Sequence, residues 1–198
     1  AEGRNVFASD ADPRGCGLDE RGYHFIGGIL DHADASCAVI APTVNSYKRL
    51  VKQGSMSGST WAPVFACYGD NNRTNMLRIP TGGGRVECRA ADSAVNPYLA
   101  AAMLFAAGLE GIRAERDPGA PNHENMYEID DTILRERGIR QLPDSLGSAI
   151  AAFAVDELAQ ATFGPDMHAS YCAYKQGEWT SYHNHVSQWE RDRYLRFF

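Results

Sequence analysis

Apolar residues recur at helical spacing in several stretches of the chain. Within residues 22–34 they fall three or four positions apart, which predicts a packed helix with a buried stripe of Tyr23, Ile26, Leu30 and Ala33. Residues 98–109 are apolar nearly all round, so we expect a core helix there, opened by Asn96 and Pro97. Two further helices are expected, over 146–158 after a Ser145 cap and from about 167 to 195.

Short apolar runs alternate with turn residues in the middle of the chain. Runs bounded by Asn- and Gly-rich segments predict strands joined as an antiparallel meander, at 63–68, 75–79 and 85–90. The Gly- and Ser-rich residues 53–60 predict a mobile loop, and the polar stretch 113–141 predicts a long excursion over the surface. The expected fold class is therefore α+β, an antiparallel sheet with packed helices.

The composition is that of an ordinary soluble globular protein. Of 198 residues, 44% are apolar and 22% charged, and the net charge of −6 argues against a nucleic-acid partner. The apolar run 98–107 is about half a membrane span, so no membrane partner is expected. Five scattered cysteines without a CxxC pair favour a reducing, cytoplasmic setting over disulfides or structural zinc. The start at Ala1, without methionine, is interpreted as entry midway into a larger protein.

The histidines are interpreted as structural. His24 and His32 could share a helix face, but no acidic residue repeats with them, so satisfied histidines are expected rather than ligands. His183 and His185 lie two positions apart, a spacing that points side chains in different directions on a helix. No metal role is assigned to any of them.

Charged residues alternate in the third expected strand. Arg85, Glu87 and Arg89 would leave one face, with successive positions roughly 7 Å apart. This separation favours a bound anion with a metal between the arginines over a mutual salt bridge. The alternative is a solvated charge ladder, because cross-strand charge pairs commonly stabilise exposed sheets.

Further arginines accompany this strand. Arg49, Arg73 and Arg78 lie close in sequence, and adjacent strands could gather them around Glu87. The planar guanidinium binds carboxylate or phosphate through two parallel hydrogen bonds and keeps its proton. Magnesium takes few protein carboxylates and completes its shell with water and phosphate oxygens. The set therefore indicates phosphoryl transfer, in which the protein mainly positions groups and neutralises charge.

Ordered motifs carry a family resemblance. The chain resembles the carboxy-terminal half of glutamine synthetases, closest to the type III-like and gamma-glutamyl-amine ligase branch, and residues 1–198 are interpreted as the carboxy-terminal portion of that catalytic domain. An arginine-lined phosphotransfer enzyme of another kind, such as a guanidino kinase, is disfavoured by this ordered set. The matching motifs are 42–50, 72–73, 78–80, 85–89, 92–100 and 125–127.

The resemblance implies a reaction and a set of roles. ATP would phosphorylate the side-chain carboxylate of L-glutamate, and ammonia or a small amine would attack the gamma-glutamyl phosphate. Glu87 would bind Mg2+ (or Mn2+), and Arg73 would also act catalytically. Substrate would be held by Arg49, Arg73 and Arg89, and the ATP phosphates by Arg73, Arg78 and Arg85.

The resemblance also implies a cytoplasmic homo-oligomer built as a ring. Relatives carry an amino-terminal domain and further metal ligands ahead of the region matched here, so no appreciable ligase activity is expected of residues 1–198 alone. The alternative is a non-catalytic fragment or pseudoenzyme that retains assembly surfaces. Binding of magnesium-ATP would discriminate between the two.

Two positions bear on specificity and regulation. Trp61 stands before Ala62-Pro63, where the resemblance implies a glutamate that helps take a proton from ammonium. An indole face can instead hold an alkylammonium, which predicts a gamma-glutamylmethylamide, ethanolamide or polyamine synthetase. The alternative is that Trp61 only packs the loop in an enzyme that still uses ammonia. Tyr127 aligns with a tyrosine that some relatives adenylylate, and it is interpreted here as structural.

Overall fold

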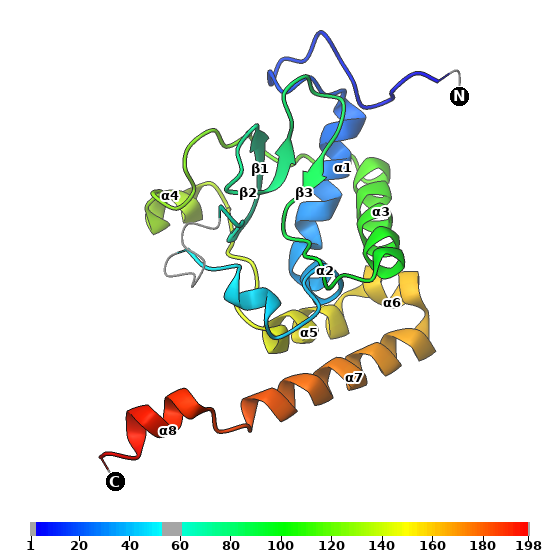
Figure 1. The fold of residues 1–198 in the computed structure, drawn as a ribbon. Coiled ribbons are helices and arrows are strands. Elements are labelled where there is room, and N and C mark those ends of the chain that lie inside the picture. Colours follow the sequence, from blue (N-terminus) through cyan, green and yellow to red (C-terminus); the bar gives the residue numbers. More distant parts are fainter. Residues whose placement is uncertain (1–2, 53–60, 198) are drawn as a thin grey trace.

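The computed structural model describes residues 3–52 and 61–197 and confirms the α+β class (Figure 1). The expected mobile loop at 53–60 lies outside the described residues. The strands are β1 (Phe65–Asp70), β2 (Asn75–Ile79) and β3 (Glu87–Cys88). The helices are α1 (Glu20–Asp31), α2 (Ala33–Ile40), a short 3-10 turn (Ser46–Lys48), α3 (Pro97–Arg113), α4 (Asp131–Glu136), α5 (Leu146–Val155), α6 (Glu157–Phe163), α7 (Pro165–His183) and α8 (Gln188–Tyr194).

The sheet is mixed, in the order β1-β2-β3. β2 and β3 pair antiparallel as expected, but β1 and β2 pair parallel, so the antiparallel prediction is wrong for the first pair. The reason lies in the link between them, which does not close a hairpin. The Asn72 amide donates to the carbonyls of Asn122 at 3.0 Å and Glu124 at 2.7 Å, which holds this link against a distant segment.

Helices α1 and α3 cross at very close range. A Cβ atom built on Gly28 would lie 2.0 Å from the carbonyl oxygen of Ala107 and 2.7 Å from the Cα of Gly111. Only glycine therefore allows the two backbones to approach so closely. The crossing packs both helices onto the main core, where Leu77 of β2 is fully buried. The sheet that carries the candidate site thus rests on a rigid layer of helices (Figure 1).

Helix α3 is amphipathic rather than buried all round. Its cap is as predicted, since the Asn96 side chain accepts from the backbone N–H groups of Tyr98 and Leu99. However, Tyr98 and Phe105 are 84% and 61% exposed, whereas Met103 is fully buried. The expectation of a wholly internal helix is wrong, because α1, α2 and α6 cover one side of α3 and leave the other side exposed.

The predicted helices of the carboxy-terminal third are each broken once. Ser145 caps α5 as expected, by accepting from the N–H of Ser148 at 3.2 Å. The predicted helix 146–158 divides at Asp156, whose side chain caps α6 by accepting from the N–H of Ala159 at 2.8 Å. The last predicted helix divides after α7, which ends at His183. Helix α7 packs against α5, and residues 184–197, the carboxy-terminal arm that contains α8, lie beyond the end of α7 (Figure 1).

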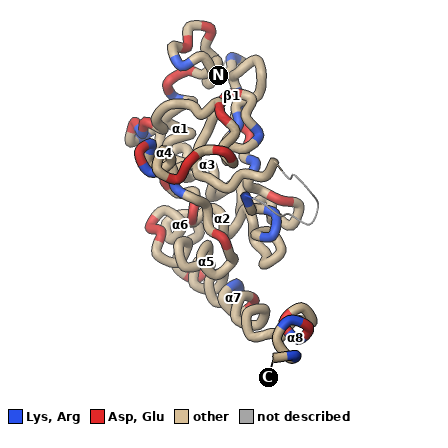
Figure 2. The backbone as a smooth tube through the Cα atoms, turned by 90° about the vertical axis from the view of Figure 1, so that its left-hand side faces the viewer, with Lys and Arg blue, Asp and Glu red and all other residues tan. Residues whose placement is uncertain are grey.

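Basic and acidic residues are both scattered along the described chain (Figure 2). Among the described residues, no helix combines the length and the apolarity that a bilayer crossing requires. All five cysteines are free thiols.

His32 connects four helices through two carboxylates. Its Nδ1 lies 2.6 Å from Asp156 Oδ2 and its Nε2 lies 2.6 Å from Glu110 Oε2, which ties the α1–α2 junction to α6 and α3. The contact with Asp156, with a smaller contribution from Glu110, raises the pKa of His32 to about 9. The expectation of a satisfied, structural histidine is confirmed.

Replacing His32 with glutamine is expected to destabilise the protein in a pH-dependent way. Because the folded-state pKa exceeds the ordinary value of 6.5, the stabilisation is complete below about pH 6.5 and disappears as the pH rises through about 9. We expect a loss on the order of 2 kcal/mol at pH 6 and a much smaller one at pH 10. Urea unfolding at both pH values measures this, with the exposed His185→Gln as control. A His32→Gln deficit of equal size at both pH values would contradict the ion-pair account.

Candidate active site

Two arginines, Arg78 and Arg89, form ion pairs with the carboxylate of Glu87 where β2 and β3 pair. Arg78 stands opposite Glu87 in the antiparallel register. Arg78 Nη1 lies 2.6 Å from Glu87 Oε2, and Arg89 Nη1 lies 2.9 Å from Glu87 Oε1. The hydrogen bond from Arg78, helped by Arg89, lowers the pKa of Glu87 below its usual value. The mutual salt bridges that the strand spacing disfavoured are therefore present. Arg85, expected on the same strand face, lies in the loop before β3.

Each arginine of this cluster is also fixed by a second contact. Arg78 Nη2 donates to Asn71 Oδ1 at 2.5 Å, and Arg89 Nε donates to the carbonyl of Arg73 at 3.0 Å. The Nε of Arg78 is buried without a partner among the described residues. A buried N–H without an acceptor costs free energy, so the guanidinium of Arg78 is incompletely satisfied in the described part of the structure, as is that of Arg49 at the same atom. Asn71 was not predicted as a site residue, and only its position directly after a strand could have suggested it.

Arg49 stabilises the backbone next to this cluster through hydrogen bonds. Its Nη groups donate to the carbonyls of Arg89 at 3.2 Å, Ala90 at 2.6 Å and Ala91 at 3.3 Å. Burial lowers the pKa of its guanidinium. The structure thus brings Arg49 beside Arg89, as expected, but with its two terminal amino groups on the backbone that follows β3.

Arg73 and Arg85 are exposed and project from loops on either side of β2. Among the described residues, neither side chain forms a hydrogen bond or ion pair. Arg85 follows Gly82, Gly83 and Gly84, which all have positive φ, so the loop geometry depends on glycine there. Arg73 lines a cavity of about 800 Å³ together with Trp61, Asp70, Asn71, Asn72, Thr74, His123 and Asn125.

Trp61 lines this cavity and has an uncommon backbone conformation. Its φ is +47°, and its side chain is 48% exposed. The carbonyl of Trp61 accepts from Arg89 Nη2 at 3.5 Å, and the carbonyl of Ala62 accepts from the Tyr127 hydroxyl. The sequence indicated Trp61 as a specificity position, but it gave no sign that Tyr127 contacts the same segment.

The residues present do not form a metal centre by themselves. No group of three or more His, Cys, Asp or Glu side chains in ligand geometry occurs among residues 3–52 and 61–197. Both oxygens of Glu87 already face arginines, so a cation there would have to displace one of them or share the carboxylate. Glu87 as a metal ligand stays a prediction.

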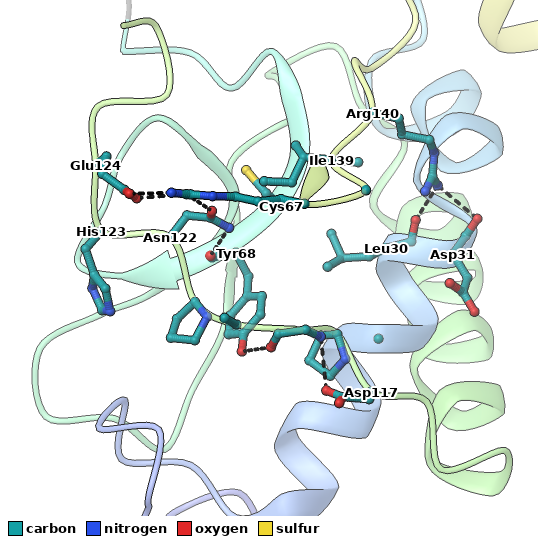
Figure 3. A pocket seen from close by; sticks show the side chains of 18 residues that line it. Leu30, Asp31, Cys67, Tyr68, Asp117, Asn122, His123, Glu124, Ile139 and Arg140 are labelled. Carbon is teal, nitrogen blue, oxygen red and sulfur yellow. Dashed lines mark hydrogen bonds and ion pairs between the residues drawn. The ribbon is translucent and has the colours of Figure 1, made fainter. Parts of the chain in front are cut away.

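A second, larger cavity of about 860 Å³ lies elsewhere, between α1, β1 and the loops at 117–124 and 137–140. Figure 3 shows Asn122, His123 and Glu124 on one wall and Leu30, Asp31 and Arg140 on the other. Its charges are paired internally, since Arg137 Nη2 lies 2.8 Å from Glu124 Oε1 and Arg140 Nε lies 3.1 Å from Asp34 Oδ2. None of the predicted site residues lines it.

Comparison with known proteins places this chain in one family. Residues 1–194 match the family described as glutamine synthetase, catalytic domain, so the chain belongs to that family. It is 45% identical over 195 residues to the glutamate–methylamine ligase of Methyloversatilis universalis, which covers 98% of this chain and 43% of that protein. It is 44% identical over 179 residues to the glutamine synthetase of Rhizobium leguminosarum bv. phaseoli, with 90% and 40% covered.

Solved structures show the same relationship. A GmaS–ADP complex superposes with a TM-score of 0.84 at 39% identity, over 96% of this chain and 42% of that one. Apo GmaS without ligand gives a TM-score of 0.79 at 38% identity. The chain therefore spans less than half the length of the relatives that it matches.

Proposed function

We propose that the protein to which this chain belongs is an ATP-dependent ligase that joins an amine to the side-chain carboxylate of L-glutamate. The carrying observation is the Arg78–Glu87–Arg89 cluster, held on the paired strands β2 and β3 of a glutamine synthetase-family fold. Because the chain spans 43% of the methylamine ligase relative, the activity is proposed for the whole protein. Residues 1–198 alone would then supply only part of the pocket.

The residues divide into phosphate-binding and substrate-binding groups. Arg73 and Arg85 are exposed and without side-chain partners among the described residues, and Arg78 has a buried donor without a partner, which supports these three as phosphate ligands. Arg89 would hold a glutamate carboxylate. Arg49 would keep Arg89 in place through the backbone carbonyls that follow it. Arg73 would serve both groups, since it lies between the cavity and the cluster.

Magnesium-ATP, when bound, would supply the phosphoryl group that turns the glutamate carboxylate into an acyl phosphate, from which phosphate leaves when the amine attacks the carbonyl carbon. The fixed guanidiniums would neutralise charge on the moving phosphoryl, and they need no reorganisation as the reaction proceeds. A single carboxylate, Glu87, stands among them and would limit the excess of positive charge.

The amine acceptor is proposed to be an alkylamine such as methylamine. Trp61 lines the 800 Å³ cavity with Arg73, and an aromatic face attracts an alkylammonium by roughly 0.5–2 kcal/mol. The relative named glutamate–methylamine ligase supports this choice. We also propose a cytoplasmic homo-oligomer, because free cysteines suit a reducing compartment and the arm exposes Trp189 at 65% and Phe197 at 78%.

Amide formation by the complete protein tests this proposal. With L-glutamate and magnesium-ATP, methylammonium is expected to give a higher kcat/KM than ammonium, ethanolamine or a polyamine. Trp61→Glu is expected to lower the methylammonium-to-ammonium ratio by about tenfold, because it removes the ring face and restores a carboxylate. Trp61→Phe, which keeps an aromatic ring, is the control. A clear lead for ammonium in the unaltered protein would remove the alkylamine proposal, and an absence of any amide would remove the ligase proposal.

A further inference from the structure

The backbone at Trp61 is held in a conformation that a bulky residue rarely adopts. A φ of +47° is left-handed, and outside glycine it is found mainly where surrounding contacts enforce it. Two such contacts are present on consecutive carbonyls: Arg89 Nη2 donates to Trp61, and the Tyr127 hydroxyl donates to Ala62. The main chain that carries the indole is therefore held by neighbours distant in sequence.

Tyr127 is itself held in place by hydrogen bonds and by packing. Its N–H donates to Asn125 Oδ1 at 3.1 Å, and the neighbouring N–H of Met126 donates to Thr74 Oγ1 at 3.1 Å. Its ring packs against the small core that includes Phe65 and fully buried Met126. Asn125 and Thr74 also line the cavity that Trp61 borders. The Tyr127 hydroxyl therefore bonds to Ala62, while the backbone of residues 126–127 is held by Asn125 and Thr74, which line the same cavity.

We propose that Tyr127 is a positioning residue that fixes Trp61 in the lining of the cavity and thereby sets the amine selectivity of the enzyme. The selectivity part of this inference rests on the proposed function. Tyr127 does not contact the amine in this account. Without the hydroxyl, the Ala62 carbonyl loses the hydrogen bond from Tyr127, and Trp61 relaxes toward negative φ, which turns the indole away from the cavity.

Selectivity of the complete enzyme is the first test. Tyr127→Phe is expected to lower the methylammonium-to-ammonium ratio of kcat/KM roughly fivefold, through a higher KM for methylammonium, with KM for ATP nearly unchanged. Tyr171→Phe is the matched control, because the Tyr171 hydroxyl also donates to a backbone carbonyl, that of Ala38 at 2.8 Å, away from the cavity. In a Trp61→Ala background, Tyr127→Phe is expected to have no further effect on the ratio. An unchanged ratio in the single variant, or an equal drop in both backgrounds, would overturn the inference.

Amide hydrogen exchange provides a second test that needs no activity. Peptides covering residues 62–68 are expected to exchange several-fold faster in Tyr127→Phe than in the unaltered protein, and at the unaltered rate in Tyr171→Phe. An unchanged exchange rate in Tyr127→Phe would overturn the claim that the Tyr127 hydroxyl holds the backbone at Ala62. If the complete protein made no amide with any amine, the proposed function and the selectivity role would fail, while faster exchange would still support Tyr127 as the support of Trp61.

Discussion

Replacing Glu87 with glutamine is expected to reduce the kcat of the complete enzyme by about a hundredfold or more. The amide has nearly the same shape but no negative charge, so it cannot pair with Arg78 and Arg89 as the carboxylate does, at 2.6 and 2.9 Å. Both guanidiniums would then lose the charged one of the two contacts that hold each of them beside the expected phosphate and substrate. The amide of the Glu87→Gln side chain would also be a poorer ligand for a divalent cation than the carboxylate. Steady-state amide formation measures the effect.

Glu124→Gln is the matched control for this substitution. Glu124 is likewise held by an arginine, Arg137, which lowers its pKa to about 2, but it lies outside the cluster. Both glutamates are substantially exposed, at 41% for Glu87 and 48% for Glu124, so either loss should change stability by only about 1 kcal/mol or less. Equal kinetic effects of the two variants, or a Glu87→Gln enzyme within threefold of the unaltered one, would contradict the assigned role.

The second large effect is expected at the crossing of α1 and α3. Gly28→Ala would place a methyl group 2.0 Å from the Ala107 carbonyl oxygen, a backbone atom that cannot move unless the helices separate. We expect a loss of about 3 kcal/mol or more, or failure to accumulate folded protein. The denaturation midpoint and soluble yield of the complete protein measure this.

Gly177→Ala is the control at a helical glycine with open space. No atom lies within 4 Å of a Cβ built there, and its φ is ordinary. Since alanine favours helix more than glycine does, this variant is expected to be neutral or up to about 1 kcal/mol more stable. Equal stability of the Gly28 and Gly177 variants would show that the helices do not require their close approach.

Features of the fold that depend on local hydrogen bonds were predictable from sequence. Asn96 and Ser145 cap their helices as expected, because a cap bonds to backbone groups two or three residues away. The bounds of β2 were also correct. The parallel pairing of β1 and β2 was not predictable, because it depends on Asn72 reaching carbonyls about fifty residues away. The exposed face of α3 was missed because an apolar sequence does not tell which side the rest of the protein covers.

The candidate site was likewise predictable only where it depends on strand register and side-chain type. The gathering of Arg78, Glu87 and Arg89 follows from strand register, which the alternation of residues indicated. Backbone carbonyls have no sequence signature, so the contacts of Arg49 with residues 89–91 and of Tyr127 with Ala62 could not be read from the chain. Chemistry carried by side-chain types was therefore visible in the sequence, and support carried by the main chain was not.

The central claim is that the guanidinium groups around Glu87 form the phosphate- and glutamate-binding side of the active site. A crystal structure of the complete protein with ADP, magnesium and L-glutamate tests it most directly. The account predicts ADP phosphates on Arg73 and Arg78, a glutamate carboxylate on Arg89, and Glu87 facing the cation. Ligands bound elsewhere, for example in the cavity of Figure 3, with the Arg78–Glu87–Arg89 contacts untouched, would contradict it.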